Sequence, residues 1–393
     1  MLLTNSPPGD KGVGQNYMRD VFACAPFRKT GCCAVLRDPN DWDVKTAGID
    51  YVFTLTQKYE SAFRPKIGGG FVAATALRVK SIRYAKLQAS RAIGFAQGLR
   101  TKDILVVLES PQMMLMGDWI ARNSDLRVHT LVWDHPEHVV ASFGHQGASK
   151  RLLLAAFHRC LAASQSIMTV ADGLKDYLSD KNPAATCTAI RSPVSQPNIA
   201  ETPEANTFVV GMAGSVTAPS EFERLQVALD ECGWAIAGKR IVLRLFGYRY
   251  VLSARAARNV QYRGFLRTTA DVIQALSECD ACFLPQPFDQ ARRNVAEFSF
   301  PTKFSTYLAS GRPVIVHAPS FASIPRFIKA RASENRSGLI STTEDSQSVV
   351  ALIKRMIQEP DFRDQQYAAT SDLQSTDFSI ETCRAELQKH FGV

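Results

Sequence analysis

The sequence predicts an α/β protein of two domains, each built on a parallel sheet. Its 393 residues exceed the length that one hydrophobic core usually serves. In the first half, short apolar runs alternate with longer helical patterns, as the strands and crossover helices of a parallel sheet do. The alternation stops in the proline-rich stretch 193–206 and then restarts. We therefore expect an N-terminal domain over 1–197 and a C-terminal domain over 198–393, whose last helix could pack back on the first domain.

The expected strands of the first half are short runs rich in apolar residues. They cover Met1–Asn5, Cys33–Leu36, Tyr51–Leu55, Ile104–Leu108, Val128–Trp133, Ile167–Val170 and Thr188–Ile190. Longer stretches with helical periodicity lie between them, at Val72–Gln97, Met113–Arg122 and Lys150–Ala163.

The second half repeats this alternation. Strands are expected at Phe208–Ala213, Ile241–Phe246, Ala281–Leu284 and Val314–Val316, and helices from Ser220, at Thr302–Ala309 and at Ser379–Phe391. Two such α/β halves normally bind their ligand at the carboxyl ends of the strands. Each half is therefore expected to contribute strand-end residues to a site.

The segment from Phe300 to Val316 carries the strongest chemical signal. Pro301 opens a short helix, and Gly311 with Pro313 closes it. The start of such a helix offers free backbone N–H groups and a positive dipole end, and Lys303 adds a formal charge. This combination suits an anionic group such as a diphosphate.

A glycine-rich turn follows the first strand and includes Gly12 and Gly14. Glycines between a strand and a helix allow the backbone to approach a phosphate or a sugar closely. The spacing is not that of the dinucleotide-binding pattern, because the third glycine is missing. A plain turn without a ligand remains the alternative.

Polar residues also follow the expected strand that ends at Trp133. Asp134 and His135 are candidates for the reaction centre, since polar residues at a strand's carboxyl end are well placed for a site. The alternative is a capped turn with surface histidines. Glu109 and Ser110, at the end of the preceding strand, are secondary candidates.

The net charge of +9 is concentrated in the first half, where residues 1–197 hold 24 Lys and Arg against 16 Asp and Glu. Between Lys58 and Lys102 there are ten basic residues and one acid, Glu60. This stretch favours an anionic partner such as a membrane surface, a phosphorylated substrate or nucleic acid. A solvated basic face is the alternative, and no nucleic-acid recognition motif accompanies the charge, so nucleic acid is not expected.

Other features narrow the class. The nine cysteines are irregularly spaced and do not suggest a disulfide framework, and Cys279 and Cys282 enter an apolar run typical of a buried strand. We find no metal-binding constellation, and expect none. The first residues lack a secretory apolar region and no membrane span is evident, so a cytoplasmic protein is expected.

Between residues 208 and 342, five segments combine a short apolar run with a glycine or proline: Val210–Ser215, Leu245–Gly247, Val260–Phe265, Cys279–Pro285 and Pro301–Val316. In these segments and in their order the chain resembles the family-4 glycosyltransferases, also called glycosyl transferases group 1. The resemblance implies a GT-B fold, two Rossmann-like domains facing each other across a cleft. It also implies that the second domain binds the nucleotide sugar and the first domain the acceptor.

By this resemblance, the donor would contact glycines, the start of the 302–309 helix and nearby polar residues. These are Gly12, Gly14, Gly214, Ser215, Gly247, Gly264, Phe265, Arg292, Arg293, Glu297, Thr302, Lys303 and Thr306. The chain departs from the family at Thr306, where a second acidic residue is common. It also lacks the Arg and Lys that in the family usually follow the glycine corresponding to Gly214. Lys303, Arg292 and Arg293 are the nearest basic substitutes in sequence.

The expected function is transfer of a hexose from a nucleotide diphosphate sugar to a glycan or lipid-linked acceptor. The resemblance implies retention of the anomeric configuration without a metal or a bound cofactor, and a role in polysaccharide biosynthesis at the cytosolic membrane face. A degenerate nucleotide-sugar-binding protein and a GT-B sugar-nucleotide epimerase are the alternatives, and a phosphorylase is disfavoured by length.

Overall fold

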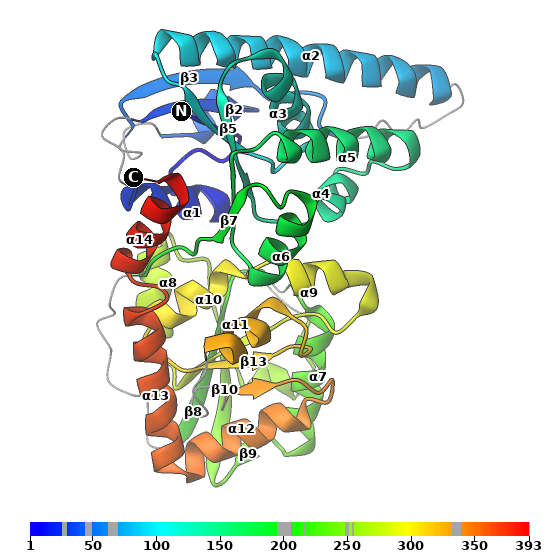
Figure 1. Cartoon of the computed structure of the whole chain (residues 1–393). Coiled ribbons are helices and arrows are strands. Elements are labelled where there is room, and N and C mark those ends of the chain that lie inside the picture. The colour runs from blue at the N-terminus through cyan, green and yellow to red at the C-terminus, as the bar shows by residue number, and fades with distance from the viewer. Residues whose placement is uncertain are drawn as a thin grey trace. The chain divides into compact units, whose positions relative to one another are not determined.

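A computed structural model describes residues 1–25, 30–43, 49–61, 70–194, 206–215, 217–247, 251–253, 255–331 and 339–392. The chain divides into two compact units. The first comprises Met1–Ile190 together with Arg384–Val393, and the second comprises Arg191–Cys383. Each unit is an α/β structure in which helices pack on a central sheet (Figure 1).

The sheet of the first unit has seven strands in the described part of the chain, in the order β3-β2-β1-β4-β5-β6-β7. All of its neighbouring strands pair in parallel. The strands are β1 (Leu2–Thr4), β2 (Gly31–Leu36), β3 (Tyr51–Thr56), β4 (Asp103–Val107), β5 (Arg127–Val132), β6 (Ser166–Thr169) and β7 (Thr186–Ala189). Because β1 lies between β2 and β4, its carboxyl end meets the end of a strand about one hundred residues away.

Helices connect these strands, as parallel pairing requires. They are α1 (Val13–Ala23), α2 (Gly70–Gly98), α3 (Pro111–Asn123), α4 (Pro136–Ser142), α5 (Gly147–Ala162) and α6 (Asp172–Lys181), with a short 3₁₀ turn at Pro39–Asp41. Local signals explain where α3 begins. Ser110 is its N-cap and accepts a bond from the Met113 N–H, and Pro111 occupies the first turn.

The second unit repeats the design. Its described sheet has the order β11-β10-β8-β12-β13-β14, and β9 pairs antiparallel with β10. The strands are β8 (Thr207–Ala213), β9 (Ala235–Ile236), β10 (Lys239–Phe246), β11 (Val260–Gly264), β12 (Ala281–Pro285), β13 (Val314–His317) and β14 (Ile340–Ser341). Apart from β9, the pairing is parallel.

The helices of the second unit are α7 (Pro219–Glu231), α8 (Thr269–Leu276), α9 (Arg293–Phe298), α10 (Thr302–Ala309), α11 (Ser323–Arg331), α12 (Gln347–Gln358) and α13 (Pro360–Ser375), with 3₁₀ turns at Ala256–Arg258 and Gln290–Arg292. A capping box sets the start of α8: Thr268 accepts from the Asp271 N–H, and Asp271 accepts from the Thr268 N–H.

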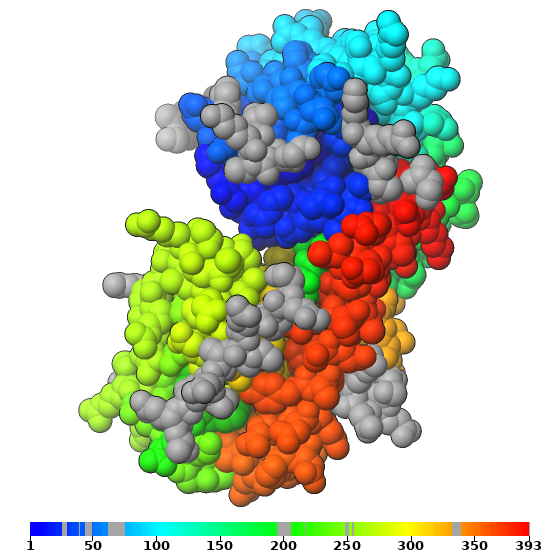
Figure 2. All heavy atoms as spheres, turned by 90° about the vertical axis from the view of Figure 1, so that its left-hand side faces the viewer, coloured from blue at the N-terminus to red at the C-terminus, as the bar shows by residue number. Residues whose placement is uncertain are grey.

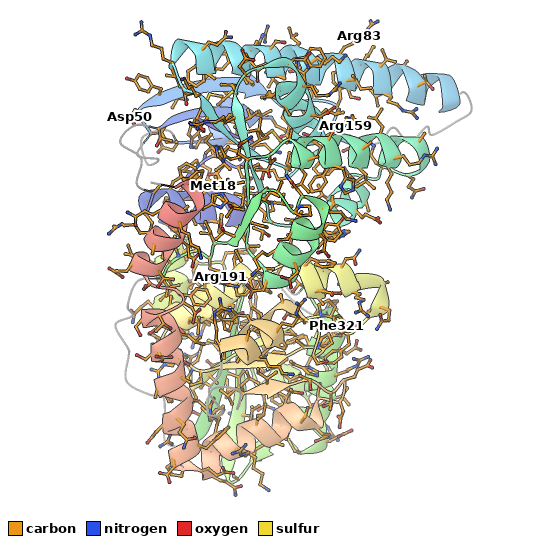
Figure 3. The ribbon with its side chains drawn as sticks, viewed as in Figure 1. Met18, Asp50, Arg83, Arg159, Arg191 and Phe321 are labelled. Atoms are coloured by element: carbon orange, nitrogen blue, oxygen red, sulfur yellow. The ribbon has the colours of Figure 1, made fainter. Side chains whose placement is uncertain are left out.

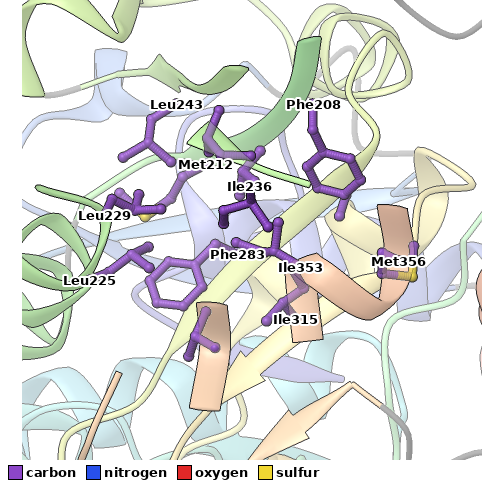
Figure 4. Close-up of a cluster of buried hydrophobic side chains, with 14 of the residues drawn as sticks. Phe208, Met212, Leu225, Leu229, Ile236, Leu243, Phe283, Ile315, Ile353 and Met356 are labelled. Carbon is purple, nitrogen blue, oxygen red and sulfur yellow. The ribbon is translucent and has the colours of Figure 1, made fainter. Parts of the chain in front are cut away.

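The core of the second unit joins side chains from its sheet and the flanking helices (Figure 4). Phe283 of β12 and Ile315 of β13 pack in one cluster with Leu225 of α7 and Ile353 of α12. Burial of such a cluster is the main source of stability, at roughly 25 cal/mol per Å² of apolar surface. It fixes the strands whose ends carry the candidate site.

The last helix, α14 (Ile380–Phe391), begins in the second unit and ends in the first. The end of the chain lies beside its N-terminal segment, red against blue, in both views (Figures 1 and 2). The Phe391 ring packs edge-on against His129 of β5, with ring centroids 5.4 Å apart. The final residues therefore help to complete the first unit.

A chain of hydrogen bonds also holds this end of α14. His390 Nε2 lies 2.7 Å from Ser166 Oγ, and His390 Nδ1 lies 3.2 Å from Thr188 Oγ1. Ser166 Oγ lies 2.7 Å from His129 Nδ1, and His129 Nε2 lies 3.2 Å from an Asp103 carboxylate oxygen. With both imidazoles neutral, each group in this chain can donate to the next, from Thr188 through to Asp103. Burial, and secondarily the proximity of His129, lowers the pKa of His390 to about 4.

The predicted α/β class and the two parallel sheets are confirmed, and the strands expected from the sequence are present within two residues of their bounds. The second unit begins at Arg191, whereas the sequence suggested residue 198. All nine cysteines are free, and Cys282 lies in the buried strand β12 as expected. Within the described ranges, no helix combines the length and the apolar character that crossing a membrane requires.

Candidate functional site

Three glycines mark the carboxyl ends of neighbouring strands in the second unit. Gly214 follows β8, Gly247 follows β10 and Gly264 ends β11. The Gly214 N–H donates to Phe246 O at 2.8 Å, and the Gly247 N–H donates to Gly264 O at 2.8 Å. The structure therefore brings these three predicted residues together along one edge of the sheet.

Glycine is required at this edge for two reasons. Gly214 has a φ of 78° and Gly247 a φ of 110°, in the region that side chains disfavour. A Cβ on Gly247 would also lie 3.2 Å from both Cα and N of Gly214. The two turns can touch because Gly247 carries no side chain, and the missing side chain of Gly214 makes room for the end of Lys303.

Lys303, in the first turn of α10, reaches the same place. Its Nζ donates to the Ser215 carbonyl oxygen, and a Cβ on Gly214 would lie 3.1 Å from its Cε. Burial lowers the pKa of Lys303 to about 8. Tyr307, one turn further along α10, holds the helix on the strand end, because its hydroxyl accepts from the Ala213 N–H at 2.8 Å.

Of the predicted arginines, Arg292 approaches this loop and Arg293 is engaged elsewhere. Arg292 donates to the Thr217 carbonyl at 3.0 Å. Arg293 forms an ion pair with Glu297 at 3.1 Å and lies over the Phe321 ring, whose centroid is 4.4 Å from its guanidinium carbon. Phe321 and its surroundings appear in Figure 3. Lys303 and Arg292 thus bring two basic side chains to the loop after Gly214.

The other residues predicted to bind the sugar donor have different surroundings. Thr306 Oγ1 donates to the Thr302 carbonyl at 3.3 Å, so its hydroxyl proton is used within α10. Gly264 has a φ of 73°, and Phe265, which follows it, is 67% exposed. An exposed phenylalanine beside a strand end offers a stacking surface for a planar ring.

In the first unit, the glycine-rich turn lies against two other strand ends. Gly12 is the N-cap of α1 with a φ of 104°. A Cβ on Gly14 would lie 2.9 Å from Ser6 Oγ and 3.3 Å from Cη2 of Trp133, which follows β5. Trp133 in turn meets Tyr17 edge-on, with ring centroids 5.9 Å apart. This close packing explains why position 14 has no side chain.

Glu109, which follows β4, bonds to the residues that lead into this turn. Its carboxylate accepts from Thr4 Oγ1 at 2.8 Å, from the Asn5 N–H at 2.9 Å, and from Ser6 through both its N–H at 3.0 Å and its Oγ at 2.6 Å. Burial raises the pKa of Glu109 to about 7, although these hydrogen bonds oppose the shift. The sequence suggested Glu109 only as a secondary candidate, and Ser6 and Trp133 were not singled out.

The predicted catalytic pair, Asp134 and His135, lies between β5 and α4. His135 is the N-cap residue of α4 and is only 7% exposed. Its ring packs on Tyr177 of α6, with centroids 4.8 Å apart. Burial lowers the pKa of His135, with Glu137 acting in the opposite direction, so the imidazole is neutral near pH 7.

The basic stretch contributes an exposed face of α2. Lys80, Arg83, Lys86 and Arg91 are exposed there, and two apolar side chains, Val79 and Leu87, are 42% and 50% exposed among them. Lys86 Nζ lies 4.5 Å from the centroid of a Trp119 ring. Arg83 on α2 and Arg159 on α5 are labelled in Figure 3. Arg64 and Lys66 of this stretch lie outside the described residues.

Among the residues that the structure describes, no group of three or more His, Cys, Asp and Glu side chains is placed to hold a metal ion. Each unit therefore has its own group of candidate residues. In the second unit these are the adjoining glycine turns, one lysine, one arginine and hydroxyl-bearing residues. In the first unit they are a glycine turn, the Glu109 carboxyl and a tryptophan.

Comparison with solved structures identifies the fold. The chain is similar to sucrose-phosphate synthase from Thermosynechococcus elongatus, with a TM-score of 0.64 and 14% identity over 100% of this chain and 98% of that one. It is equally similar to Anabaena HepE in complex with UDP-glucose, with a TM-score of 0.64 and 14% identity over 100% and 99% of the two chains. Trehalose-6-phosphate synthase OtsA gives a TM-score of 0.64 at 10% identity over 99% and 97%.

These similarities confirm the predicted GT-B fold, which is built from two Rossmann-like domains. The similarity extends over the whole chain, beyond the 208–342 region whose motifs suggested it. No protein-family model and no curated protein sequence matches the chain.

Proposed function

We propose that this protein is a glycosyltransferase that moves a hexose from a nucleotide diphosphate sugar to a hydroxyl of a glycan or lipid-linked acceptor. The observation that best supports this is the meeting of Gly214, Gly247 and Lys303 at one edge of the second sheet. Two side-chain-free turns admit a ligand to the backbone, and a half-buried amine supplies positive charge. A diphosphate is the ligand that needs both.

In the proposed reaction, the bond between the sugar C1 and the diphosphate oxygen breaks as C1 bonds to the acceptor oxygen. The acceptor hydroxyl gives its proton to the departing phosphate, and the configuration at C1 is retained. Lys303, Arg292 and the backbone N–H groups at the start of α10 stabilise the charge on the leaving group. His135, neutral near pH 7, and Asp134 orient the sugar and acceptor, and no metal ion or cofactor takes part.

The exposed face of α2 supports the choice of a lipid-linked acceptor. Lys80, Arg83, Lys86 and Arg91 surround the exposed Val79 and Leu87, a mixture suited to the surface of an anionic membrane. In this proposal the enzyme attaches reversibly to the cytosolic membrane face.

One observation favours a second function, a degenerate nucleotide-sugar-binding protein. The hydroxyl of Thr306 donates within its own helix, and no carboxylate stands at that position to bind a ribose. Such a protein would bind the nucleotide without transferring the sugar.

Calorimetry followed by a turnover assay separates the two functions. UDP-glucose is the first donor to test, because HepE, which shares the fold, was solved with it. The proposed enzyme binds UDP far more tightly than uridine and releases UDP from UDP-glucose faster when a mixture of sugar acceptors is present. Tight UDP binding without any release would identify the binding protein, and equal affinity for UDP and uridine would contradict both. GDP, dTDP and ADP are tested in the same way.

A further inference from the structure

The two oxygens of the Glu109 carboxylate have different surroundings. Oε1 receives three donors, Thr4 Oγ1 and the N–H groups of Asn5 and Ser6. Oε2 receives one, the Ser6 hydroxyl at 2.6 Å. A carboxylate oxygen has two lone pairs, so Oε2 keeps the capacity to accept a further bond.

This contact determines the direction of the hydrogen bond that the Ser6 hydroxyl makes. An ionised carboxylate only accepts hydrogen bonds, so the Ser6 hydroxyl must donate its proton to Oε2. The lone pairs of Ser6 Oγ are then left to accept. Ser6 Oγ and Glu109 Oε2 therefore form two adjacent acceptors, which match the O–H donors of a sugar or polyol and repel a phosphate.

An apolar surface borders this pair. The side chain that Gly14 lacks would meet Ser6 Oγ at 2.9 Å and Trp133 Cη2 at 3.3 Å, so Ser6 and the Trp133 ring flank the same glycine. Trp133 is half-buried, and Tyr17 packs against it edge-on. Aromatic rings commonly bind the C–H face of a sugar while neighbouring acceptors bind its hydroxyls.

We propose that Ser6 and Glu109, with Trp133 beside them, bind a hydroxyl of an uncharged sugar acceptor in the first unit. This inference rests on the proposed function and adds to it the residues that receive the acceptor and the chemical class of the group they bind. The two units then have opposite preferences: Lys303 attracts an anion, whereas the Ser6–Glu109 pair accepts from neutral hydroxyls.

Proton uptake by Glu109 provides an independent readout. Because burial places its pKa at about 7, the carboxyl becomes protonated over the range in which most other carboxylates stay ionised. A protonated Glu109 donates a bond where it previously accepted one, so hydroxyl binding weakens as pH falls. The ionisable groups of the adjoining segments are Asp10 and Lys11 in the turn, Glu60, which bonds Ser110, and Asp134 and His135 after β5.

Saturation-transfer NMR with methyl α-D-glucopyranoside as the probe tests the pair on the full-length protein. We expect contact with the parent protein at pH 8, an at least fivefold weaker signal at pH 6, and a similar loss at pH 8 in Ser6→Ala and Glu109→Gln. Ser6→Ala leaves the three bonds to Oε1 in place, so it tests the pair even if Glu109→Gln fails to fold. Glu137→Gln is the matched control, because Glu137 is an exposed carboxylate paired with Lys150 at 2.7 Å, and it should keep the parental signal.

Parental signals in a folded Ser6→Ala variant, or no contact between the glucoside and the parent protein at pH 8, would overturn the assignment. UDP affinity, measured on the same samples, separates this outcome from failure of the proposed function. Glucoside contact without UDP binding would contradict the proposed function and leave the pair standing. UDP binding without glucoside contact would contradict the assignment of the Ser6–Glu109 pair and leave the proposed function standing.

Discussion

The backbone of Gly247 lies so close to that of Gly214 that a methyl group on Gly247 would stand 3.2 Å from the Gly214 Cα and N. The strand ends of β10 and β8 are therefore in direct backbone contact at the candidate nucleotide site. Gly233 has no such neighbour: its φ of 66° lies in the left-handed region, where a side chain costs less than at the 110° of Gly247, and nothing lies within 4 Å of its Cβ position.

Comparing these two glycines measures the combined cost of the close contact and of the larger φ at Gly247 against the cost of a left-handed alanine alone. Gly233→Ala should lower the free energy of unfolding by about 1–2 kcal/mol, the cost of a left-handed alanine. Gly247→Ala should add about 1–3 kcal/mol for overpacking and should also weaken UDP binding. Urea unfolding and calorimetry measure both effects. Equal losses in the two variants would show that the Gly214 contact is unimportant.

Lys303→Ala should weaken UDP binding by about 1.5–3 kcal/mol and leave uridine binding nearly unchanged, because only the diphosphate contacts the amine. Since the free protein's Lys303 has a pKa of about 8, UDP affinity should also fall as pH rises above 8, and this fall should be absent in the variant. Lys354→Ala, at an exposed site on α12, is the control. An unchanged UDP affinity in Lys303→Ala would remove the lysine from the site.

His135→Ala and Asp134→Ala should slow sugar transfer strongly while leaving UDP affinity within about twofold, because they lie in the first unit and the proposed nucleotide site lies in the second. Steady-state kinetics with UDP-glucose, together with calorimetry, would measure this. Since His135 is buried against Tyr177, thermal unfolding must show that the variant is folded at the assay temperature. If both variants transfer sugar at the rate of the parent protein, the turn that contains Asp134 and His135 has a structural role only.

Reversing two charges on α2, with Lys80→Glu and Arg83→Glu together, should reduce binding to anionic vesicles. Each basic residue near such a surface contributes about 1 kcal/mol, so loss and reversal of two charges is measurable by co-sedimentation. Binding of the parent protein to anionic vesicles should weaken when the salt concentration is raised from low to moderate. Lys329→Glu with Lys354→Glu, on the second unit, is the matched control. If the parent protein does not prefer anionic over neutral vesicles at low salt, α2 is a solvated basic face.

Acid should destabilise the protein through His390. The pKa of His390 is about 4 in the folded protein and near 6.5 when unfolded, so the unfolded chain takes up the proton first as pH falls. The contribution of neutral His390 to the free energy of unfolding is fully present above pH 6.5. It is lost progressively as pH falls to 4, by up to ~3 kcal/mol. His390→Gln should therefore flatten the stability profile over this range, measured by urea unfolding. An unaltered pH dependence would mean that His390 does not control it.

Local sequence signals predicted much of this fold and part of its site. Pro301 and Gly311 delimit α10 from within the segment itself, so Lys303 could be placed in the first turn of a helix from nearby residues alone. Glycines after apolar runs likewise predicted the strand ends at Gly214 and Gly247. Such features depend on residues a few positions apart, and the pattern records them directly.

Contacts that depend on strand order could not be predicted in this way. Nothing near Ser6 indicates that its hydroxyl meets Glu109, because that contact exists only where β1 pairs with β4. The same holds for Lys303, whose amine reaches the carbonyl of Ser215 through the packing of α10 on β8. The sequence indicated Lys303, Arg292 and Arg293 as basic substitutes for the loop after Gly214, but not which of them contact it. Lys303 and Arg292 bond to its carbonyl oxygens, whereas Arg293 pairs with Glu297.

The division of the first unit between residues 1–190 and 384–393 has a consequence for how the chain matures. A ribosome makes the N-terminal portion first, yet His129 and Ser166 receive His390 and Phe391 only after the second unit has been synthesised. Until then the first unit is incomplete and less stable than it is in the finished protein. Synthesis of the second unit thus precedes completion of the first, and a nascent chain halted before residue 384 would be a favourable substrate for chaperones and proteases.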